Sequence, residues 1–376
     1  MGSCIRVEME TGDSFTCIDV EESFDLPVPR FDPTRGVTPF NLLRSRESVE
    51  HLTTAFSRHF GQGFLDRAQD VFRHCCLLLL ERGLTLADLP RLLSDERYRT
   101  GLVRRTQNES VELFFRHVDS LGKRQWAFQS EAVRNKVAQF CLHPLIKPCL
   151  ATRDCIPIEG QLLASFPERI FADNAGLLGA MLVSHIYETA LGRPHGSQLH
   201  TTYIDEVQLS ATELLVELSM RGRKRGHAIC VGHQVLQQPP FDKNPGLLAA
   251  IHGATGTMCL FAMSWPDACY FASHVLPGTG AEVKIGSDHE PQAFWAVSEF
   301  DRQMASILHN QQQGELFVRI RGVGTFEAVT YDVSDIPEPQ NVPYVSPLLP
   351  PAPPEPPEQD NEAGEDDGEY LGDPNG

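Results

Sequence analysis

From residue 151 onward, short apolar runs alternate with helical segments, and this alternation constrains the fold more than any other feature. Strands are predicted at "QLLASF", "TTYI" and "HAICVG", which begin at Gln161, Thr201 and His227. Helices are predicted between them, over residues 174–192 and 212–222. Strands that alternate with helices form mainly parallel sheets covered by helices on both faces, so the pattern predicts an α/β fold.

The same pattern continues toward the C-terminus, with a helix over "NPGLLAAIHG", a strand over "GTMCLFAM" and a helix that opens at Pro266. Two late strands follow, at "GELFVRIRG" and "GTFEAVTYDV". An early strand at "FTCID" precedes a Pro-rich connection. Asp173 is expected to cap the helix over 174–192, because a short acceptor side chain can bind the free N–H groups of a first turn.

Residues 45–150 carry only helical signals. "GFLDRAQDVFRHCCLLLLERG" places Phe64, Val71, Phe72 and Leu79 at helical spacing, and Gly83 supplies a stop. Four regions are therefore predicted: residues 1–44 as the N-terminal strand and connection of the core, 45–150 as an all-α insertion, 151–340 as the rest of the α/β core, and 341–376 as a disordered tail.

The net charge of −18 is concentrated at the C-terminus. Residues 349–376 contain nine acids and no Lys or Arg, so the rest of the chain carries −18 + 9 = −9. This Pro-rich, acidic tail has too little apolar surface to offset its ordering entropy, and we expect it to be disordered. It would act as a solubilising tail or bind a partner. The charge of the body argues against general coating of nucleic acid, but it permits a local basic channel.

The cysteines and hydropathy indicate a reduced, cytoplasmic chain. None of the ten cysteines forms a C-x-x-C pair, and most lie in apolar runs such as "CCLLLL", where a free thiol packs as a small hydrophobe. Disulfides and structural zinc are therefore not expected. We also expect no membrane span and no secretory signal, since no apolar stretch approaches 18 residues.

Two adjacent acids, Asp205 and Glu206, follow the predicted strand "TTYI". Two negative charges about 6 Å apart repel by roughly 2–3 kcal/mol at an effective dielectric near 20. Caps, Arg partners or water could offset that repulsion in a structural role. A bound Mg²⁺ would offset it directly, with Asp205 holding the ion through water and Glu206 polarising an attacking water.

Two neighbouring segments strengthen the nucleotide interpretation. Gln234 follows the next strand and could hydrogen-bond a γ-phosphate, although it could equally be an ordinary polar loop residue. "RGRKRG", residues 221–226, could place a cation on a neighbouring subunit's phosphate. It could also be a solvated helix C-terminus, where cations are favoured. The order and spacing of the three segments together favour a nucleotide site.

Several segments together resemble the HerA/FtsK-like ATPases, in particular the type IV secretion and conjugative DNA-transfer proteins, over nearly all of residues 15–335. They are "VPRFDPTRGVTPFNLL", the helix that begins "DNAGLLG", "YIDEVQ", "RKRG", "GHQ" and "GTMCLFAMSWPDA". The resemblance implies a RecA-like core in a ring, usually a hexamer, that couples ATP hydrolysis to moving DNA. It implies Asp205 and Glu206 as the Walker B pair with Mg²⁺, Gln234 as the sensor and Arg223 as a candidate arginine finger. It also permits a place at the inner membrane face through partners.

The chain departs from the family at the phosphate-binding loop. The sequence contains no G-x-x-x-x-G-K-[ST] loop, which would cradle phosphates on backbone N–H groups. Its only Gly-Lys pair, Gly122-Lys123, is followed by Arg124 in the helical block. In addition, Leu42 stands where the family has Pro, and Ala262 where it has Arg. Either another polypeptide supplies the loop, or the chain is a truncated or split product, or ATPase activity is lost.

Two functions of different classes follow. The first is a subunit of a DNA-translocating motor that is inactive alone and needs a loop from elsewhere. The second is a non-catalytic RecA-like protein that docks to a motor and displays the acidic tail. An unrelated hydrolase has little support, because no G-x-S-x-G nucleophile elbow is present.

Overall fold

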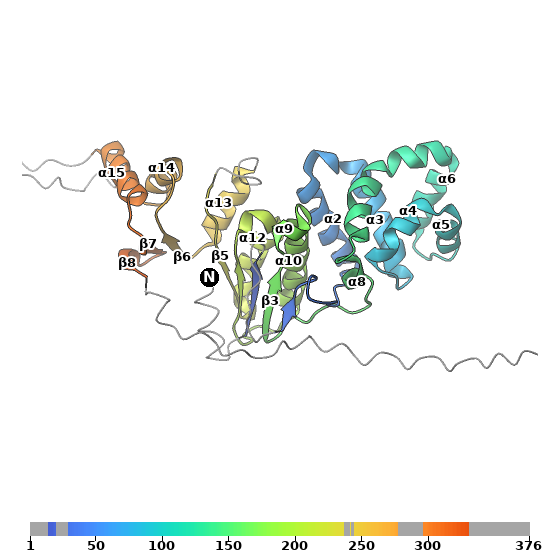
Figure 1. Ribbon diagram of the computed structural model, residues 1–376, viewed down its shortest axis with the longest axis horizontal. Helices are drawn as coiled ribbons and strands as arrows, with labels where there is room; N and C mark the ends of the chain where they lie inside the picture. The colour runs from blue at the N-terminus through green and yellow to red at the C-terminus, as the bar shows by residue number, and fades with distance from the viewer. Residues whose placement is uncertain (1–13, 20–28, 237–240, 242–243, 277–295, 331–376) are drawn as a thin grey trace, which may run out of the picture.

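The computed structural model describes residues 14–19, 29–236, 241, 244–276 and 296–330. The described elements form three parts (Figure 1). A block of helices lies at the right of the view, a five-stranded sheet with its helices lies in the middle, and a small sheet with two helices lies at the left. The first two parts match the predicted all-α segment and α/β core.

The central sheet is entirely parallel, with the strand order β2-β3-β1-β4-β5. Its strands are β1 (Ser14–Asp19), β2 (Arg30–Phe31), β3 (Gln161–Ser165), β4 (His200–Ile204) and β5 (His227–Val231). The predicted mainly parallel sheet is therefore confirmed. The earliest strand in the sequence, β1, lies in the middle and pairs with both β3 and β4.

A polar layer crosses the amino ends of β1, β4 and β5. The ring of His200 hydrogen-bonds the hydroxyl groups of Ser14 and Thr16, at 2.7 Å from Nδ1 and 3.0 Å from Nε2. His227 Nε2 bonds the Thr202 hydroxyl at 3.0 Å, and the two imidazole centroids are 5.2 Å apart. Burial lowers the pKa of His200 to about 4 and that of His227 to about 3, so both rings are neutral at pH 7.

Helix α10 (Asn174–Gly192) is buried along most of its length, and its bounds are those predicted. It contacts α2, α11 and α12, and two of its glycines allow one of these approaches. A Cβ on Gly176 would lie 2.5 Å from the backbone oxygen of Leu209, and one on Gly179 would lie 2.8 Å from Ser210 Cβ. Small residues in α10 therefore let α11 (Val207–Ser210), the segment that follows the acid pair, pack directly on the helix.

The predicted cap of α10 is wrong. Asp173 does precede the helix, but its backbone is already helical, with φ −55° and ψ −25°, and its side chain makes no capping hydrogen bond. The short α9 (Glu168–Phe171) ends just before it, with Ala172 at φ 46°. This tight turn between two helices leaves Asp173 without the extended backbone that a side-chain cap requires.

Between residues 45 and 150 all described elements are helices. They are α2 (Arg46–Phe60), η1 (Gly61–Gly63), α3 (Asp66–Glu81), η2 (Leu86–Asp88), α4 (Leu89–Ser94), α5 (Glu96–Val103), α6 (Glu109–Gln129), the π-helix η3 (Val133–Ala138), α7 (Gln139–Leu142) and α8 (Lys147–Leu150). Their core contains buried aromatic rings. The ring centroid of Phe56 lies 4.8 Å from that of Phe72 and 5.7 Å from that of Phe140. The Gly122-Lys123 pair lies inside α6, where Gly122 kinks the helix at φ 79°.

Two more helices complete the middle part, α12 (Glu213–Arg221) and α13 (Pro245–Ala254), and the 3₁₀ turn η4 (Gly222–Arg225) joins α12 to β5. The small sheet is antiparallel, with the order β6-β7-β8. Its strands are β6 (Thr257–Leu260), β7 (Glu315–Ile320) and β8 (Gly324–Val329), and α14 (Trp265–His274) packs on α15 (Val297–His309).

The strand predicted at "GTMCLFAM" is therefore not a further member of the parallel sheet. Instead, β6 pairs antiparallel with β7. Helix α15 was not predicted, and the predicted tail from residue 341 lies outside the described residues. Within the described ranges, no helix has the length and apolar character needed to cross a membrane.

Candidate nucleotide site at the ends of β4 and β5

The acid pair lies at the carboxyl edge of the parallel sheet. The N–H of Asp205 donates to Ile18 O at the end of β1, at 3.0 Å. On the other side, Gly232 at the end of β5 donates to Ile204 O and accepts from Val207 N, both at 2.9 Å. Asp205 and Glu206 are therefore held between β1 and β5, at the edge where parallel α/β sheets bind ligands.

Glu206 is the more constrained of the two acids. It adopts the left-handed conformation, with φ 45° and ψ 53°, which costs a non-glycine residue about 1 kcal/mol or more. Its side chain is buried, with 7% of its surface exposed. The amide of Gln208 donates to one carboxylate oxygen, and the amide of Gln234 donates to the other. The predicted sensor, Gln234, is thus in contact with the predicted base.

Asp205 is half-buried and accepts a hydrogen bond at 3.1 Å from the N–H of Glu206. Among the ion pairs of the described residues, none involves Asp205 or Glu206. Amide donors, rather than cations, therefore offset the charge of Glu206. The described part also contains no group of three or more His, Cys, Asp or Glu placed to hold a metal ion. The acid pair could thus hold Mg²⁺ only with water or nucleotide oxygens as further ligands.

A histidine pair next to the acids was not identified from the sequence. The rings of His233 and His252 stack with centroids 5.9 Å apart, and the Nδ1 atom of each is buried without a hydrogen-bond partner among the described residues. Burial lowers the pKa of His233, and burial beside His233 lowers that of His252 to about 4. Asp267, which is also buried, accepts from Ser264 Oγ at 2.8 Å and Leu236 N at 3.4 Å. The polar site therefore extends from β4 to the start of α14.

The predicted arginine finger lies at the opposite edge of the sheet. Arg223 is exposed in η4, which leads into the amino end of β5, whereas Glu206 and Gln234 lie at the carboxyl end. Five strand residues separate the two edges, about 16 Å at roughly 3.3 Å per residue. Arg223 therefore does not belong to the site of its own chain. Its action on a neighbouring subunit stays a prediction.

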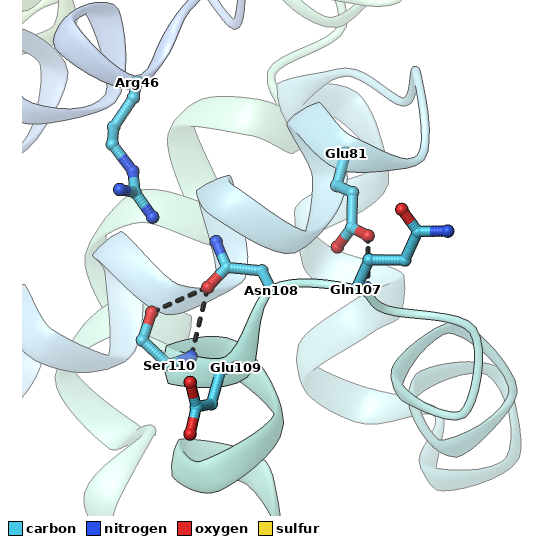
Figure 2. Close-up of a pocket in the computed structure, with 6 residues that line it drawn as sticks. All are labelled: Arg46, Glu81, Gln107, Asn108, Glu109 and Ser110. Carbon is cyan, nitrogen blue, oxygen red and sulfur yellow. Dashed lines mark hydrogen bonds between the residues drawn. The ribbon is translucent and has the colours of Figure 1, made fainter.

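A hollow of about 580 Å³ lies elsewhere, in the helical block (Figure 2). It is lined by Arg46, Glu81, Gln107, Asn108, Glu109 and Ser110. Glu81 accepts from the N–H of Gln107 at 2.6 Å, and Asn108 caps α6 by accepting from Ser110 N at 3.1 Å. Its polar groups thus fix the turn into α6, and the hollow shares no residue with the acid pair.

Comparisons with known proteins place this geometry in a known fold. No protein-family model matches the chain, and no curated protein matches it in sequence. Among solved structures, the unbound bacterial conjugative coupling protein TrwBΔN70 aligns with a TM-score of 0.60 and 13% identity over 87% of this chain and 80% of that one. TrwB in complex with a non-hydrolysable ATP analogue aligns with a TM-score of 0.60 and 14% identity over 86% and 80%.

VirB4 of Thermoanaerobacter pseudethanolicus aligns with a TM-score of 0.60 and 12% identity, over 88% of this chain and 84% of that one. A further TrwB structure contains ADP and Mg²⁺. At these identities the likeness concerns the fold. The resemblance seen in separate sequence segments is confirmed at that level: the chain has the α/β fold of the conjugative coupling protein TrwB and of VirB4.

Proposed function

We propose that this chain is part of a nucleotide-hydrolysing motor that moves DNA in conjugative transfer or type IV secretion, with its phosphate-binding loop supplied from outside these 376 residues. One observation carries the proposal. At the carboxyl edge of a parallel sheet lie two adjacent acids that have no cationic partner among the described residues, and Gln234 donates to one of them, Glu206. The TrwB-like fold supports it, since TrwB itself has been crystallised with an ATP analogue and with ADP and Mg²⁺.

The proposed role of each residue in hydrolysis follows from its position in the site. Asp205 is the more accessible acid and would hold Mg²⁺ through water; the bound ion would neutralise charge on the phosphate oxygens. Glu206 would orient a water and accept its proton. Gln234 is exposed and donates to Glu206, so it could pass between that carboxylate and a γ-phosphate oxygen. Arg223 would act on the site of the next copy in a ring, which we propose to be a hexamer around DNA.

Substitution of the acids tests this proposal in the assembled complex. Asp205→Ala and Glu206→Gln should each abolish Mg-ATP hydrolysis, because one removes the ligand for the ion and the other removes the base. Glu168→Gln is a matched control, since Glu168 is an exposed acid just beyond the carboxyl end of β3 in the same sheet. The isolated chain should not hydrolyse ATP. Hydrolysis that survives both acid substitutions would exclude the proposal.

A second function, a non-catalytic interaction protein with this fold, is favoured by the state of Glu206. Both of its carboxylate oxygens accept amide hydrogens and little of the side chain reaches solvent. A base held in this way must exchange a partner before it can contact water. This alternative predicts that no assembly containing the chain depends on Glu206 for hydrolysis. It also predicts that calorimetry with Mg-ATP detects no binding to the isolated chain, and micromolar binding would count against it.

A further inference from the structure

The proposed base, Glu206, has two amide partners that differ in accessibility. Gln208, in α11, donates from its side chain to one carboxylate oxygen, and Gln234 donates to the other. Gln208 is buried, with 8% of its surface exposed, whereas Gln234 is exposed. Gln234 could therefore leave toward a ligand in the open part of the site, while Gln208 is enclosed by the protein.

The contact with Glu206 explains a glutamine at position 208. Its Nε2 atom donates to the carboxylate, whereas its Oε1 atom is buried without a hydrogen-bond partner among the described residues. The reverse orientation of the amide would bring Oε1 against the carboxylate, and neither oxygen has a hydrogen to donate. A buried acceptor without a partner costs free energy, which a leucine or methionine would avoid. The donor atom, rather than the volume of the side chain, therefore accounts for Gln208.

The backbone that carries Gln208 is fixed by hydrogen bonds and by packing. The N–H of Val207 donates to a backbone oxygen at the end of β5, and the N–H of Leu209 donates to Glu206 O, both at 2.9 Å. The backbone oxygen of Leu209 lies so close to Gly176 of α10 that a Cβ there would be 2.5 Å away. The main chain on both sides of Gln208 is thus held, and its amide is a fixed point for the carboxylate.

We propose that Gln208 is a positioning residue for hydrolysis. It holds one oxygen of the Glu206 carboxylate throughout, while the other oxygen exchanges Gln234 for the attacking water. The inference rests on the proposed function, in which Glu206 accepts a proton from that water. The last torsion of a glutamate side chain is broad, so a carboxylate without a fixed partner points in many directions. A base that must meet a bound water needs one direction, and Gln208 supplies it.

Gln208 becomes the more important donor once Gln234 has left. The two glutamines supply the hydrogen bonds that the Glu206 carboxylate accepts from side chains in the described part of the chain. A hydrogen bond to a charged group is roughly twice as strong as one between neutral groups. The buried amide of Gln208 bonds Glu206 and no other described residue. Its loss should therefore change the direction of the base and leave nucleotide binding unaffected.

Nuclear magnetic resonance tests the contact in the isolated full chain, without nucleotide. With isotope-labelled nitrogen in the glutamine side chains, one amide proton of Gln208 should be shifted downfield by its bond to the carboxylate. Glu206→Met keeps the length of the side chain but removes the acceptor, so it should abolish this shift in a chain that circular dichroism shows to be folded. A Gln208 resonance that is the same with and without Glu206→Met would overturn the inference.

Gln208→Leu tests the positioning role in the assembled complex. The apolar side chain fills a similar volume without a donor, so kcat for Mg-ATP hydrolysis should fall by about tenfold to roughly 100-fold. KM should stay within about twofold of the wild type, because the residue does not bind the nucleotide. Ser210→Ala is the matched control, since Ser210 is also buried in α11 and its Oγ has no hydrogen-bond partner among the described residues. This variant should keep the wild-type kcat. Should Gln208→Leu fail to fold, Gln208→Met gives the same test with an unbranched chain.

The outcomes separate this inference from the proposed function. A wild-type kcat in Gln208→Leu, or an equal loss in Ser210→Ala, overturns the positioning role. A higher kcat also overturns it, because Gln208 would then restrain the base instead of directing it. Hydrolysis that depends on Glu206 but not on Gln208 contradicts this inference alone, whereas hydrolysis that survives Glu206→Gln contradicts the proposed function itself.

Discussion

Helix α10 packs closely on the segment that follows the acid pair. This packing predicts that Gly→Ala substitutions at two positions of the helix change the free energy of unfolding in opposite directions. Replacing a glycine by alanine in a helix gains up to about 1 kcal/mol in the free energy of unfolding. At Gly176, however, the new Cβ would lie 2.5 Å from the backbone oxygen of Leu209, far inside normal contact. Such overpacking typically costs about 1–3 kcal/mol. We expect Gly176→Ala to destabilise the protein by about 1 kcal/mol net.

The control is Gly192→Ala, at the end of the same helix, where a Cβ would meet nothing within 4 Å. This variant should be as stable as the wild type or slightly more stable. Urea unfolding followed by circular dichroism measures both, and the free energies of unfolding of the two variants should differ by about 1–3 kcal/mol, with a correspondingly lower urea midpoint for Gly176→Ala. Equal midpoints, or a Gly176→Ala variant more stable than the wild type, would refute the close approach of α11 and the positioning of Glu206 that depends on it.

Three further outcomes follow from the buried groups. The folded state keeps His200 and His227 neutral, whereas the unfolded chain takes up protons on both below about pH 6.5. The free energy of unfolding should therefore fall as the pH drops from about 6.5 toward 4, by roughly 1.4 kcal/mol per pH unit per histidine. Urea midpoints at pH 7 and pH 5 measure this, and equal midpoints would contradict it. Burial raises the pKa of the Cys75 thiol to about 12 and also raises the pKa of the Cys141 thiol. Both thiols should therefore resist alkylation at pH 8 until urea unfolds the chain, and mass spectrometry of the labelled peptides would show this. Labelling in the native state would argue against their burial. Phe72→Ala should lower stability by about 3–5 kcal/mol in a urea titration, and a loss below 1 kcal/mol would mean that the ring is not packed as described.

The sequence correctly predicted the helices and strands whose positions depend on local apolar patterns. The helix over 174–192 has an uninterrupted apolar pattern, and the strand before Asp205 is bounded by its acids, so both were placed correctly. Adjacency of β4 and β5 followed from the strand–helix–strand connection, which placed Gln234 beside Glu206. These features depend on residues near one another in the chain or on a connection rule that holds for most folds.

The features that were missed depend on distant partners. The segment of β6 could have joined either sheet, and its partner residues in β7 lie 57 to 63 positions further along the sequence. The stack of His233 on His252 joins a strand end to a separate helix, and no spacing rule relates them. The contact of Gln208 with Glu206 was within reach, since both lie in "YIDEVQ".

The central position of β1 has a consequence for folding while the protein is being synthesised on the ribosome. The first strand that pairs with β1 is β3, which begins at residue 161. At a synthesis rate of about 5–20 residues per second, β1 therefore remains unpaired for roughly 7–30 seconds. During that interval the helices encoded in between can collapse on local contacts alone. Nascent chains should therefore carry a partly formed helical block, in which α2 still lacks its partner α10, and an unpaired β1. Chaperones that shield short apolar segments at the ribosome should raise the yield of native protein.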